Sequence, residues 1–298
     1  MLNLQHISLP ETFYEEETRD GGYVVSADMK KIWAVQMDLL QLFMNVCEKH
    51  HLRYYAEGGT LLGAVRHGGY IPWDDDVDLT MPREDYRILC EIAPEEFKYP
   101  YFWQTEHSDA GMRRGSAKLR NSETTAIMED ELDLRLPVNQ GIFIDIFPLD
   151  ELPPAAEGLE FVSRLRDLWK KSLKYADQVL KTDPKSVNPY FQEFEEHICR
   201  YNGSGSKKIA MLSFYRGSSY GIRNVSDYEE TEWMPYENLQ IRVPKGYRNI
   251  LRSTYGAWKR YEIGTAIHTG LIFDTEISYK EYLTRLDRAE NGERQDEK

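Results

Sequence analysis

Cysteine is scarce in this sequence of 298 residues, and long apolar runs are absent from it. The three cysteines, Cys47, Cys90 and Cys199, are widely spaced and odd in number, so the sequence indicates neither a disulfide framework nor a Cys-x-x-Cys zinc site. No run of roughly 18 apolar residues is present to span a membrane, and the N-terminus lacks a basic segment followed by an apolar core. We therefore expect a cytoplasmic protein with ordinary thiols and no transmembrane segment.

Basic residues are also in short supply, with 37 Lys and Arg against 50 Asp and Glu and a net charge of -13. This balance argues against nucleic acid as a partner, because a phosphate backbone attracts positively charged surfaces. An apolar content of 41% is enough to bury a full core, in one large or two small domains. An acidic enzyme that acts on a phosphate compound has to rely on bound metal and on local basic residues.

Four aspartates crowd into five positions: Asp74, Asp75, Asp76 and Asp78. In an extended chain, alternation places Asp76 and Asp78 on one face, roughly 6 to 7 Å apart, with apolar neighbours on the other face. Their repulsion, about 2 to 3 kcal/mol at an effective dielectric of about 20, is a cost that a bound cation removes. Carboxylate oxygens suit Mg²⁺ or Mn²⁺, whose remaining ligands are water and phosphate oxygens. We predict a divalent-metal and phosphate site here, and the alternative is an acidic surface turn.

A second aspartate occurs within an apolar run at residues 141–150. A run of this length predicts a buried strand, in which a lone charge is costly unless it is paired or bound to a metal. Asp145, at the centre of the run, is therefore predicted to be the third carboxylate of the site. The alternative is that Asp145 is a buried ion-pair partner.

A glycine-rich stretch precedes the acidic cluster. Gly58 and Gly59 follow a predicted short strand at 52–57 and allow backbone N–H groups to approach an anion. A short helix is predicted over 60–67, capped by Thr60 and ended by a second glycine pair. Its N-terminus would face the aspartates and favour a phosphate group there.

Four basic residues are candidates for contact with the substrate. Lys118 and Arg120 alternate on one face of a strand predicted at 115–120, where they would offset phosphate charge; a solvated edge strand is the alternative. Arg66 and His67 lie at the far end of the helix at 60–67. A histidine in that position is more often a partner of the helix C-terminus than a catalyst.

The rest of the chain divides at a change in composition after Asp150. Further helices are predicted at 27–50, with Ser26 as its cap, and at 82–97, 157–181 and 247–255. A strand is predicted at 101–105, an apolar element at 209–214 and a strand pair within 237–247. The expected organisation is an irregular, loosely attached arm at 1–27, a catalytic core at 28–150, a mainly helical subdomain at 151–290 that completes the site, and a charged tail at 291–298.

The string GGTLLGAVRHGGYIPWDDDVDL, which begins at Gly58, and FIDIFPLD, which begins at Phe143, resemble the LicD family. That family holds bacterial phosphocholine transferases and is related to fukutin-type ribitol-phosphate transferases. The resemblance is strong over about residues 28–150 and weak beyond. It implies an α/β (α+β) fold, with a nucleotidyltransferase-like mixed sheet, flanking helices and a helical C-terminal subdomain. Near the C-terminus, Tyr255-Gly256-Ala257 departs from the family's Tyr-Gly-Asp step, which leaves the local site there in doubt.

The resemblance also implies an activity. It is the metal-dependent transfer of a phospho-alcohol group, most simply phosphocholine, from a CDP-linked donor such as CDP-choline to a sugar hydroxyl of a glycan or glycolipid, with release of CMP. Such acceptors are teichoic acid or lipopolysaccharide precursors, which would bring a cytoplasmic enzyme to the inner membrane face. The alternatives are ribitol- or glycerol-phosphate transfer, transfer of NMP by a nucleotidyltransferase, and a non-catalytic glycan-binding protein.

In this interpretation each candidate residue has a role. Asp76 and Asp78 hold Mg²⁺ or Mn²⁺, and Asp145 is either a third ligand or the base that accepts the acceptor's proton. The residues expected to bind substrate are Gly58, Gly59, Thr60, Arg66, His67, Lys118 and Arg120. Asp74 and Asp75 are expected to form the turn and support the ligands.

Aromatic residues are dense between positions 233 and 261. An aromatic cage there would hold a quaternary ammonium group by cation–π attraction. Simple packing is the alternative, because aromatic residues make up 12% of the whole chain. The six side chains concerned are Trp233, Tyr236, Tyr247, Tyr255, Trp258 and Tyr261.

Overall fold

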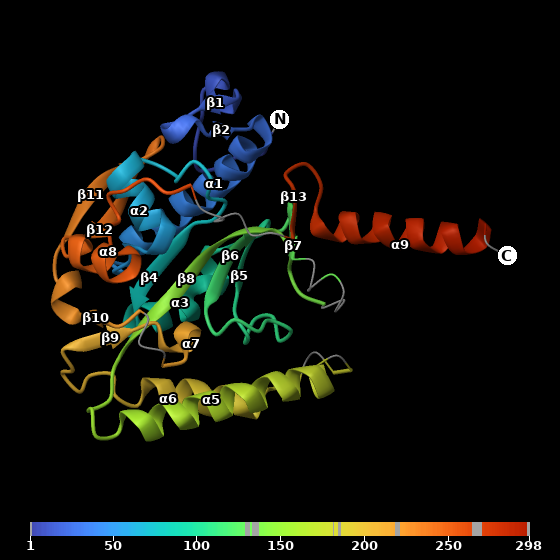
Figure 1. Cartoon of the computed structure of the whole chain (residues 1–298). Helices are drawn as coiled ribbons and strands as arrows, with labels where there is room; N and C mark the ends of the chain where they lie inside the picture. Colours follow the sequence, from blue (N-terminus) through green and yellow to red (C-terminus); the bar gives the residue numbers. More distant parts are fainter. Residues whose placement is uncertain are drawn as a thin grey trace.

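The computed structural model describes residues 2–128, 132, 137–180, 182–183, 186–217, 221–263 and 270–296. A seven-stranded mixed sheet lies at its centre (Figure 1). Its strands are β3 (Tyr55–Ala56), β4 (Asp78–Pro82), β5 (Tyr101–Gln104), β6 (Ala117–Asn121), β8 (Ile142–Glu151), β9 (Lys208–Ala210) and β10 (Arg223–Asn224). β4 pairs in parallel with β8, whereas β6 and β9 pair with β8 in antiparallel fashion. This mixed sheet with flanking helices confirms the α+β fold class.

The two faces of β8 have different environments because its side chains alternate. Ile142, Ile144 and Ile146 are fully buried in the main apolar core, while Phe143 and Asp145 point to the opposite, partly open face. β6 repeats this pattern, with Ala117 and Leu119 fully buried in the same core. One face of the sheet is therefore core, and the other is available for a site.

Three helices pack around the sheet. α1 (Ala27–Lys49) contacts β8 and β6, and Ser26 caps it by accepting a hydrogen bond from the backbone N–H of Met29 at 3.1 Å. α3 (Arg83–Glu96) contacts β4 and β8. α2 (Gly58–His67) connects β3 to the acidic loop. This loop, residues 68–77, contains Asp74, Asp75 and Asp76 and leads into β4. The predicted helices at 27–50 and 82–97 are confirmed.

A second apolar cluster lies below the sheet in Figure 1. It is built by α5 (Gly158–Tyr175), which continues into a π-helical turn at Ala176–Leu180, and by α6 (Pro189–Cys199). β9 and the short α7 (Leu212–Tyr215) connect this helical pair to the sheet. The predicted helix at 157–181 is confirmed over most of its length.

The chain then returns to the first core. β11 (Thr231–Tyr236) and β12 (Leu239–Pro244) form a hairpin, which is followed by α8 (Tyr247–Tyr255). The predicted strand pair within 237–247 is wrong in its start, because the first strand precedes Glu237 and the turn lies at Glu237 and Asn238. The hairpin and α8 pack with α2 in the main core. The expected helical subdomain thus consists of two parts with separate cores.

The N-terminal segment is bound closely to the core, so the expectation of a loosely attached arm is wrong. It contains η1 (Glu11–Tyr14), β1 (Glu17–Thr18), η2 (Asp20–Gly22) and β2 (Val24–Val25). Phe13 and Val25 are buried, and the Asp38 carboxylate accepts hydrogen bonds from the backbone N–H groups of Gln5 and His6 at 2.9 and 2.6 Å. These partners lie more than 30 residues away, where local sequence patterns carry no signal.

A small peripheral sheet joins β7 (Thr125–Met128) to β13 (Leu271–Asp274). α9 (Tyr279–Asp296) follows and projects away from the body of the molecule (Figure 1). The predicted charged tail at 291–298 is therefore helical as far as Asp296, and residues 297–298 lie outside the described residues. None of the described helices combines the length and apolar character that crossing a bilayer requires.

Candidate functional site

Three of the predicted residues form a row across the open face of the sheet. Asp78 on β4 is directly opposite Asp145 on β8, and Asp145 is directly opposite Lys118 on β6. Because paired residues on neighbouring strands point to the same face, the row follows from the strand register. Asp76 lies in the loop just before β4 and lines the same cavity as these three residues. The predicted convergence of two strands on one acidic site is therefore present.

The acidic loop is held from behind by α1. The indole Nε1–H of Trp33 donates a hydrogen bond to the backbone carbonyl of Asp74 at 2.9 Å, and the Gln36 amide donates to that of Asp75 at 2.7 Å. The carboxylates of Asp74, Asp75 and Asp76 can bring one oxygen each within 4.8 Å of one another. This grouping places Asp74 and Asp75 close enough to Asp76 to share a cation with it, a closer position than the supporting one expected for them.

The two glycines that begin α2 leave space for carboxylates. Gly58 has a φ of +56°, and a Cβ atom there would lie 2.9 Å from Oδ2 of Asp78. A Cβ atom on Gly59 would lie only 2.2 Å from Oδ2 of Asp74. A side chain at either position would therefore push an aspartate away from the start of α2, where free backbone N–H groups favour anions.

Thr60 has a different role from the predicted helix cap. α2 begins at Gly58, with Glu57 at the capping position, so Thr60 lies inside the first turn. Its hydroxyl is buried and accepts a hydrogen bond from the backbone N–H of Asp78 at 2.8 Å. Thr60 thus fixes the start of β4 against α2 and positions the Asp78 carboxylate.

Asp74, Asp75, Asp76 and Asp78 form the acidic group of the site. Burial and mutual repulsion disfavour the charged form of its carboxylates. Burial raises the pKa of the Asp78 carboxyl well above its usual range, and the charges of Asp76, Asp145 and Asp74 add to the effect. Burial likewise raises the pKa of Asp74, followed by the charges of Asp76 and Asp75. A divalent cation would remove this repulsion. The observed crowding therefore fits a metal site built from hard oxygen ligands.

Lys118 is the cation closest to Asp145. Its ammonium group lies 2.7 Å from both carboxylate oxygens of Asp145 and 3.4 Å from the centre of the Phe143 ring. Burial lowers the pKa of Lys118 to about 8, although the charge of Asp145 opposes the shift. The ion pair that the sequence left as an alternative for Asp145 is present, next to Asp78.

Arg120 lies two residues after Lys118 on β6 and is bonded to other parts of the protein. Its guanidinium donates to the Gln104 side chain at 2.5 Å and to the Gly141 carbonyl at 2.6 Å, and it stacks 4.7 Å from the Phe143 ring. Only 3% of Arg120 is exposed. The structure therefore does not bring Arg120 to the carboxylates, although it shares a face of β6 with Lys118.

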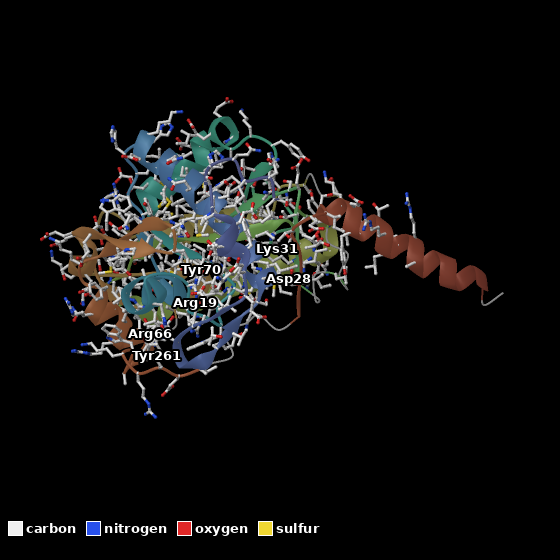
Figure 2. The ribbon with its side chains drawn as sticks, turned by 90° about the horizontal axis from the view of Figure 1, so that it is seen from above. Arg19, Asp28, Lys31, Arg66, Tyr70 and Tyr261 are labelled. Carbon is white, nitrogen blue, oxygen red and sulfur yellow. The ribbon has the colours of Figure 1, made fainter. Side chains whose placement is uncertain are left out.

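Arg66 and His67 lie at the opposite end of α2, about 12 to 14 Å along the helix from Gly58. Arg66 donates to the backbone carbonyls of Trp258 and Arg260 at 3.0 and 3.1 Å, and its guanidinium lies 5.0 Å from the Tyr261 ring (Figure 2). These contacts attach the segment after α8 to α2. They do not bring Arg66 to the acidic group.

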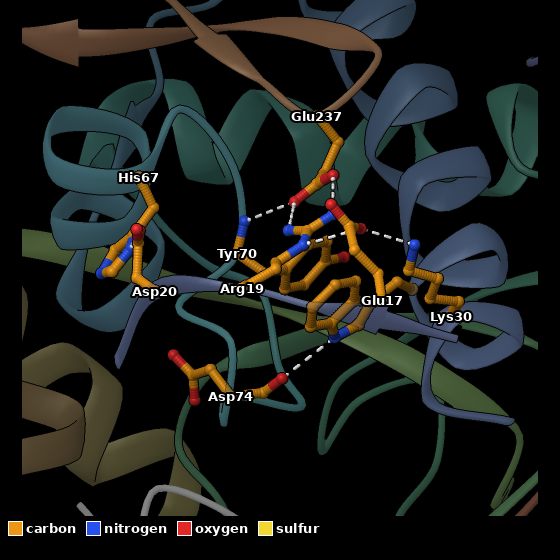
Figure 3. Close-up of polar contacts among 9 residues, drawn as sticks. Glu17, Arg19, Asp20, Lys30, His67, Tyr70, Asp74 and Glu237 are labelled. Atoms are coloured by element: carbon orange, nitrogen blue, oxygen red, sulfur yellow. Dashed lines mark hydrogen bonds and ion pairs between the residues drawn. The ribbon is translucent and has the colours of Figure 1, made fainter. Parts of the chain in front are cut away.

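His67 is held as a neutral imidazole. Arg66 donates to its Nε2 at 2.8 Å, so the proton lies on Nδ1, which donates to the Asp20 carboxylate at 2.8 Å. Burial lowers the pKa of His67. Figure 3 shows His67 facing Asp20, separate from Asp74. The sequence-based interpretation of His67 as a structural partner agrees with this placement.

A cavity of about 260 Å³ opens over the row of Asp78, Asp145 and Lys118. Its lining also contains four aromatic side chains that the sequence did not reveal as site residues: Phe143, Phe147, Phe214 and Tyr215. Phe143 and Phe147 could have been found, because each lies two residues from Asp145 and alternation puts it on the same face. Glu57 and Arg114 also line the cavity, and nothing in the local sequence pattern distinguishes them.

The six aromatic residues proposed as a cage are divided among several contacts, although two of them, Tyr247 and Trp258, lie with ring centres 6.5 Å apart. Tyr236 is buried beside Tyr70, with ring centres 4.9 Å apart, and Tyr261 lies against Arg66. Trp233 is 53% exposed on β11 and is covered on one side by Arg242. The structure does not gather these rings around one space, which favours the packing alternative.

Comparison with known proteins agrees with this geometry. The family described as LicD/FKTN/FKRP, nucleotidyltransferase domain, matches residues 51–152, which contain the aspartates, the glycine pair, Thr60 and the four basic candidates described above. The lipopolysaccharide cholinephosphotransferase LicD of Haemophilus influenzae is 33% identical over 242 residues, which cover 76% of this chain and 89% of that protein. The human ribitol 5-phosphate transferase FKRP is 57% identical over 42 residues, which cover 14% of this chain and 8% of that protein.

The mixed sheet carries a carboxylate on each of two paired parallel strands, beside a glycine pair at a helix start and an adjacent lysine. The nucleotidyltransferase-domain family match and the transferases among the relatives give the class of enzyme, which is a phosphotransferase. The extent of the similarity then identifies the family: this chain belongs to the LicD family.

Proposed function

We propose that this chain moves a phospho-alcohol group from a CDP-linked donor to a sugar hydroxyl of a cell-surface glycan precursor and releases CMP. The observation that carries the proposal is the alignment of Asp78, Asp145 and Lys118 beside the acidic loop, at the mouth of one cavity. Phosphocholine is the favoured group, because the Haemophilus influenzae relative is a lipopolysaccharide cholinephosphotransferase. We also propose that the enzyme acts in the cytoplasm, at the membrane face where such acceptors are assembled.

Mg²⁺ or Mn²⁺ would be held by Asp76 and Asp78, with Asp74 and Asp75 close enough to contribute. The raised pKa values of Asp74 and Asp78 support this assignment, since uncompensated carboxylates would otherwise remain crowded together. When bound, the cation would neutralise the diphosphate and the charge that develops on the departing CMP.

The protein's own groups would bind and orient the donor. Backbone N–H groups of Gly58 and Gly59 at the start of α2 would donate to phosphate oxygens. Lys118 would offset negative charge from the opposite side of the cavity. Asp145, held by Lys118, would either complete the metal site or accept the proton of the acceptor hydroxyl.

The direct test is CMP release by the purified protein with Mg²⁺ or Mn²⁺, with CDP-choline, CDP-ribitol and CDP-glycerol compared in parallel. We expect metal-dependent CMP release from one donor, and no release by Asp76→Asn, whose melting temperature without metal should be no lower than that of the unchanged protein. Asp28→Asn is the matched control, because Asp28 is an exposed aspartate at the surface of α1 (Figure 2).

Four outcomes would change the proposal. Preference for CDP-ribitol or CDP-glycerol would change the transferred group within the same reaction class. Release of pyrophosphate from a nucleoside triphosphate would identify a nucleotidyltransferase. If no CDP-alcohol raises the melting temperature in the presence of metal, the donor assignment is wrong. Full activity of Asp76→Asn would remove the metal assignment.

A further inference from the structure

A second cleft lies on the edge of the molecule formed by α1 and the β11–β12 hairpin. It has a volume of about 440 Å³, within the range of about 300 to 1,000 Å³ typical of small-molecule sites. Its lining includes Gln41, Asn45 and Glu48 from α1, and Trp233, Gln240 and Arg242 from the hairpin. None of these residues lines the cavity over the carboxylates.

Trp233 differs from the other five tryptophans in its exposure. Trp33, Trp73, Trp103 and Trp169 are buried, and Trp258 is half-buried, whereas 53% of Trp233 is exposed. Trp233 lies on β11, whose alternation directs its side chain away from the core that receives Tyr236. An exposed indole is a flat apolar surface that needs a partner of matching shape to be covered.

Arg242 lies beside the exposed ring of Trp233. Its guanidinium lies 5.1 Å from the Trp233 ring centre and 5.6 Å from the ring centre of Tyr54. Among the contacts of the described residues, Arg242 has no hydrogen bond or ion pair, so its N–H groups remain available to a ligand. The Tyr54 hydroxyl in the same lining is buried and has no partner within the described part of the chain.

The polar part of the lining is nearly neutral in charge. Glu237 already binds Arg19 and the backbone N–H of Tyr70, so Glu48 and Arg242 are the two remaining opposite charges. The other polar groups are the Tyr54 hydroxyl and four amides, which both donate and accept hydrogen bonds; Gln41 donates to Asn45 at 2.8 Å. Such a lining disfavours polyanions and lipid chains. It suits a neutral ligand that carries many hydroxyl groups and one apolar face.

We infer that this cleft binds sugar units of an oligosaccharide, with a sugar ring stacked on Trp233 and its hydroxyl groups bonded to Arg242 and the amides. Tyr54 precedes Gly58 by four residues, roughly 13 Å of extended chain, which sets the scale of the distance that a glycan held here has to span to reach the carboxylates. That the glycan is the acceptor rests on the proposed function, whereas binding at the cleft does not.

The test is a titration of the purified protein with lactose and with N,N′-diacetylchitobiose, followed by saturation-transfer NMR. We expect at least one disaccharide to bind, and Trp233→Ala to weaken binding about tenfold or more, as for loss of a central aromatic contact. Asn45→Ala, at an exposed position of α1, should also weaken it. Tyr99→Ala is the matched control, because Tyr99 is another exposed aromatic residue, 75% accessible, and lies outside the cleft.

The inference is overturned if neither disaccharide binds, or if both cleft variants bind as the unchanged protein does. A second measurement links the cleft to the reaction. With a polymeric acceptor, Trp233→Ala should raise KM and leave kcat unchanged, whereas a single-sugar acceptor should show no change in KM. If the protein releases CMP from no donor but binds a disaccharide through Trp233, the proposed function fails and this inference stands.

Discussion

At the scale of single residues, the site depends on two glycines, whose lack of a side chain leaves room for carboxylates. Gly59 has no side chain where the Asp74 carboxylate lies, and Gly58 adopts a positive φ beside Asp78. Both glycines allow carboxylates to approach the start of α2. The glycine pair is therefore a requirement of the acidic group and not only a flexible turn.

Gly59→Ala should impair the site more than the fold. The added Cβ would lie 2.2 Å from Oδ2 of Asp74, so the carboxylate must move. We expect at least a tenfold loss of CMP release and a destabilisation of about 1 to 3 kcal/mol, measured by urea unfolding. Gly158→Ala is the control, because nothing lies within 4 Å of the added atom there. Equal behaviour of the two variants would contradict the steric argument.

Glu106 is a second residue whose environment has a measurable consequence. It accepts hydrogen bonds from the backbone N–H groups of Arg114 and Gly115 at 2.9 and 2.6 Å, and burial raises its pKa from 4.5 to about 7. Because its pKa is higher in the folded chain, the folded state binds the proton more tightly. The resulting stabilisation is complete below about pH 4.5 and is lost as pH rises through about 7.

Glu106→Gln should flatten this pH dependence. The amide oxygen still accepts both N–H bonds but never becomes charged. We expect the free energy of unfolding of the variant, relative to the unchanged protein, to increase by on the order of 2 kcal/mol between pH 5 and pH 8. Urea unfolding at pH 5, 6, 7 and 8 measures it, and parallel profiles for the two proteins would contradict it.

At the scale of elements, a buried ion pair joins the two strands that carry the site. Arg83, at the start of α3 directly after β4, makes two hydrogen bonds of 2.7 Å to Asp150 near the end of β8. Asp150 is fully buried, and Asn202 donates a further hydrogen bond to it at 2.8 Å. The pair fixes β4 relative to β8, and with it the placement of Asp78 beside Asp145.

Arg83→Met should destabilise the protein by about 3 to 5 kcal/mol, because it leaves a buried carboxylate without its cation. The double variant Arg83→Met with Asp150→Asn should recover much of that loss, since no buried charge then remains. Chemical unfolding of the four proteins in the cycle measures both effects. A double variant as unstable as the single one would show that the loss comes from packing.

At the scale of the whole molecule, segments distant in sequence are held together around the acidic loop. Arg19 of the N-terminal segment donates to the Glu237 carboxylate in the β11–β12 turn at 2.5 and 2.8 Å, and Glu237 accepts a third bond from the backbone N–H of Tyr70 at 3.0 Å (Figure 3). Tyr70 stacks on Trp33, the residue that holds Asp74. The N-terminal segment and the β11–β12 turn thus together hold the loop that carries the aspartates.

A double-mutant cycle of Arg19→Met and Glu237→Gln should reveal this link. We expect a coupling free energy of about 1 to 3 kcal/mol for stability. Glu237→Gln should reduce CMP release less than Arg19→Met does, because its amide oxygen still accepts from Tyr70 and carries no charge, whereas Arg19→Met leaves the mostly buried Glu237 carboxylate without its cation. Additive effects in the cycle, or full activity of Arg19→Met, would contradict a positioning role for the pair.

Local sequence patterns correctly predicted the features that depend only on residues close together in the chain, such as the face of a strand or the start of a helix. Period-two alternation placed Asp145 on the open face of β8, and the Ser26 cap and helical spacing identified α1. The same alternation placed Asp76 and Asp78 on the side of the chain that faces the cavity, although β4 begins only at Asp78. These predictions succeeded because strand and helix geometry repeats over a few residues.

The tertiary structure decided which long-range partner each side chain finds. The sequence left Arg120, Arg66 and His67 open between substrate contact and a structural role, and the fold gives them Gln104, the carbonyls after α8 and Asp20 as partners. The sequence likewise could not show that the hairpin returns to the first core. Side-chain partners and core packing are set by contacts between residues distant in the chain, and no local period encodes them. The sequence by itself therefore determined the family and the acidic strands, and the fold decided how they converge.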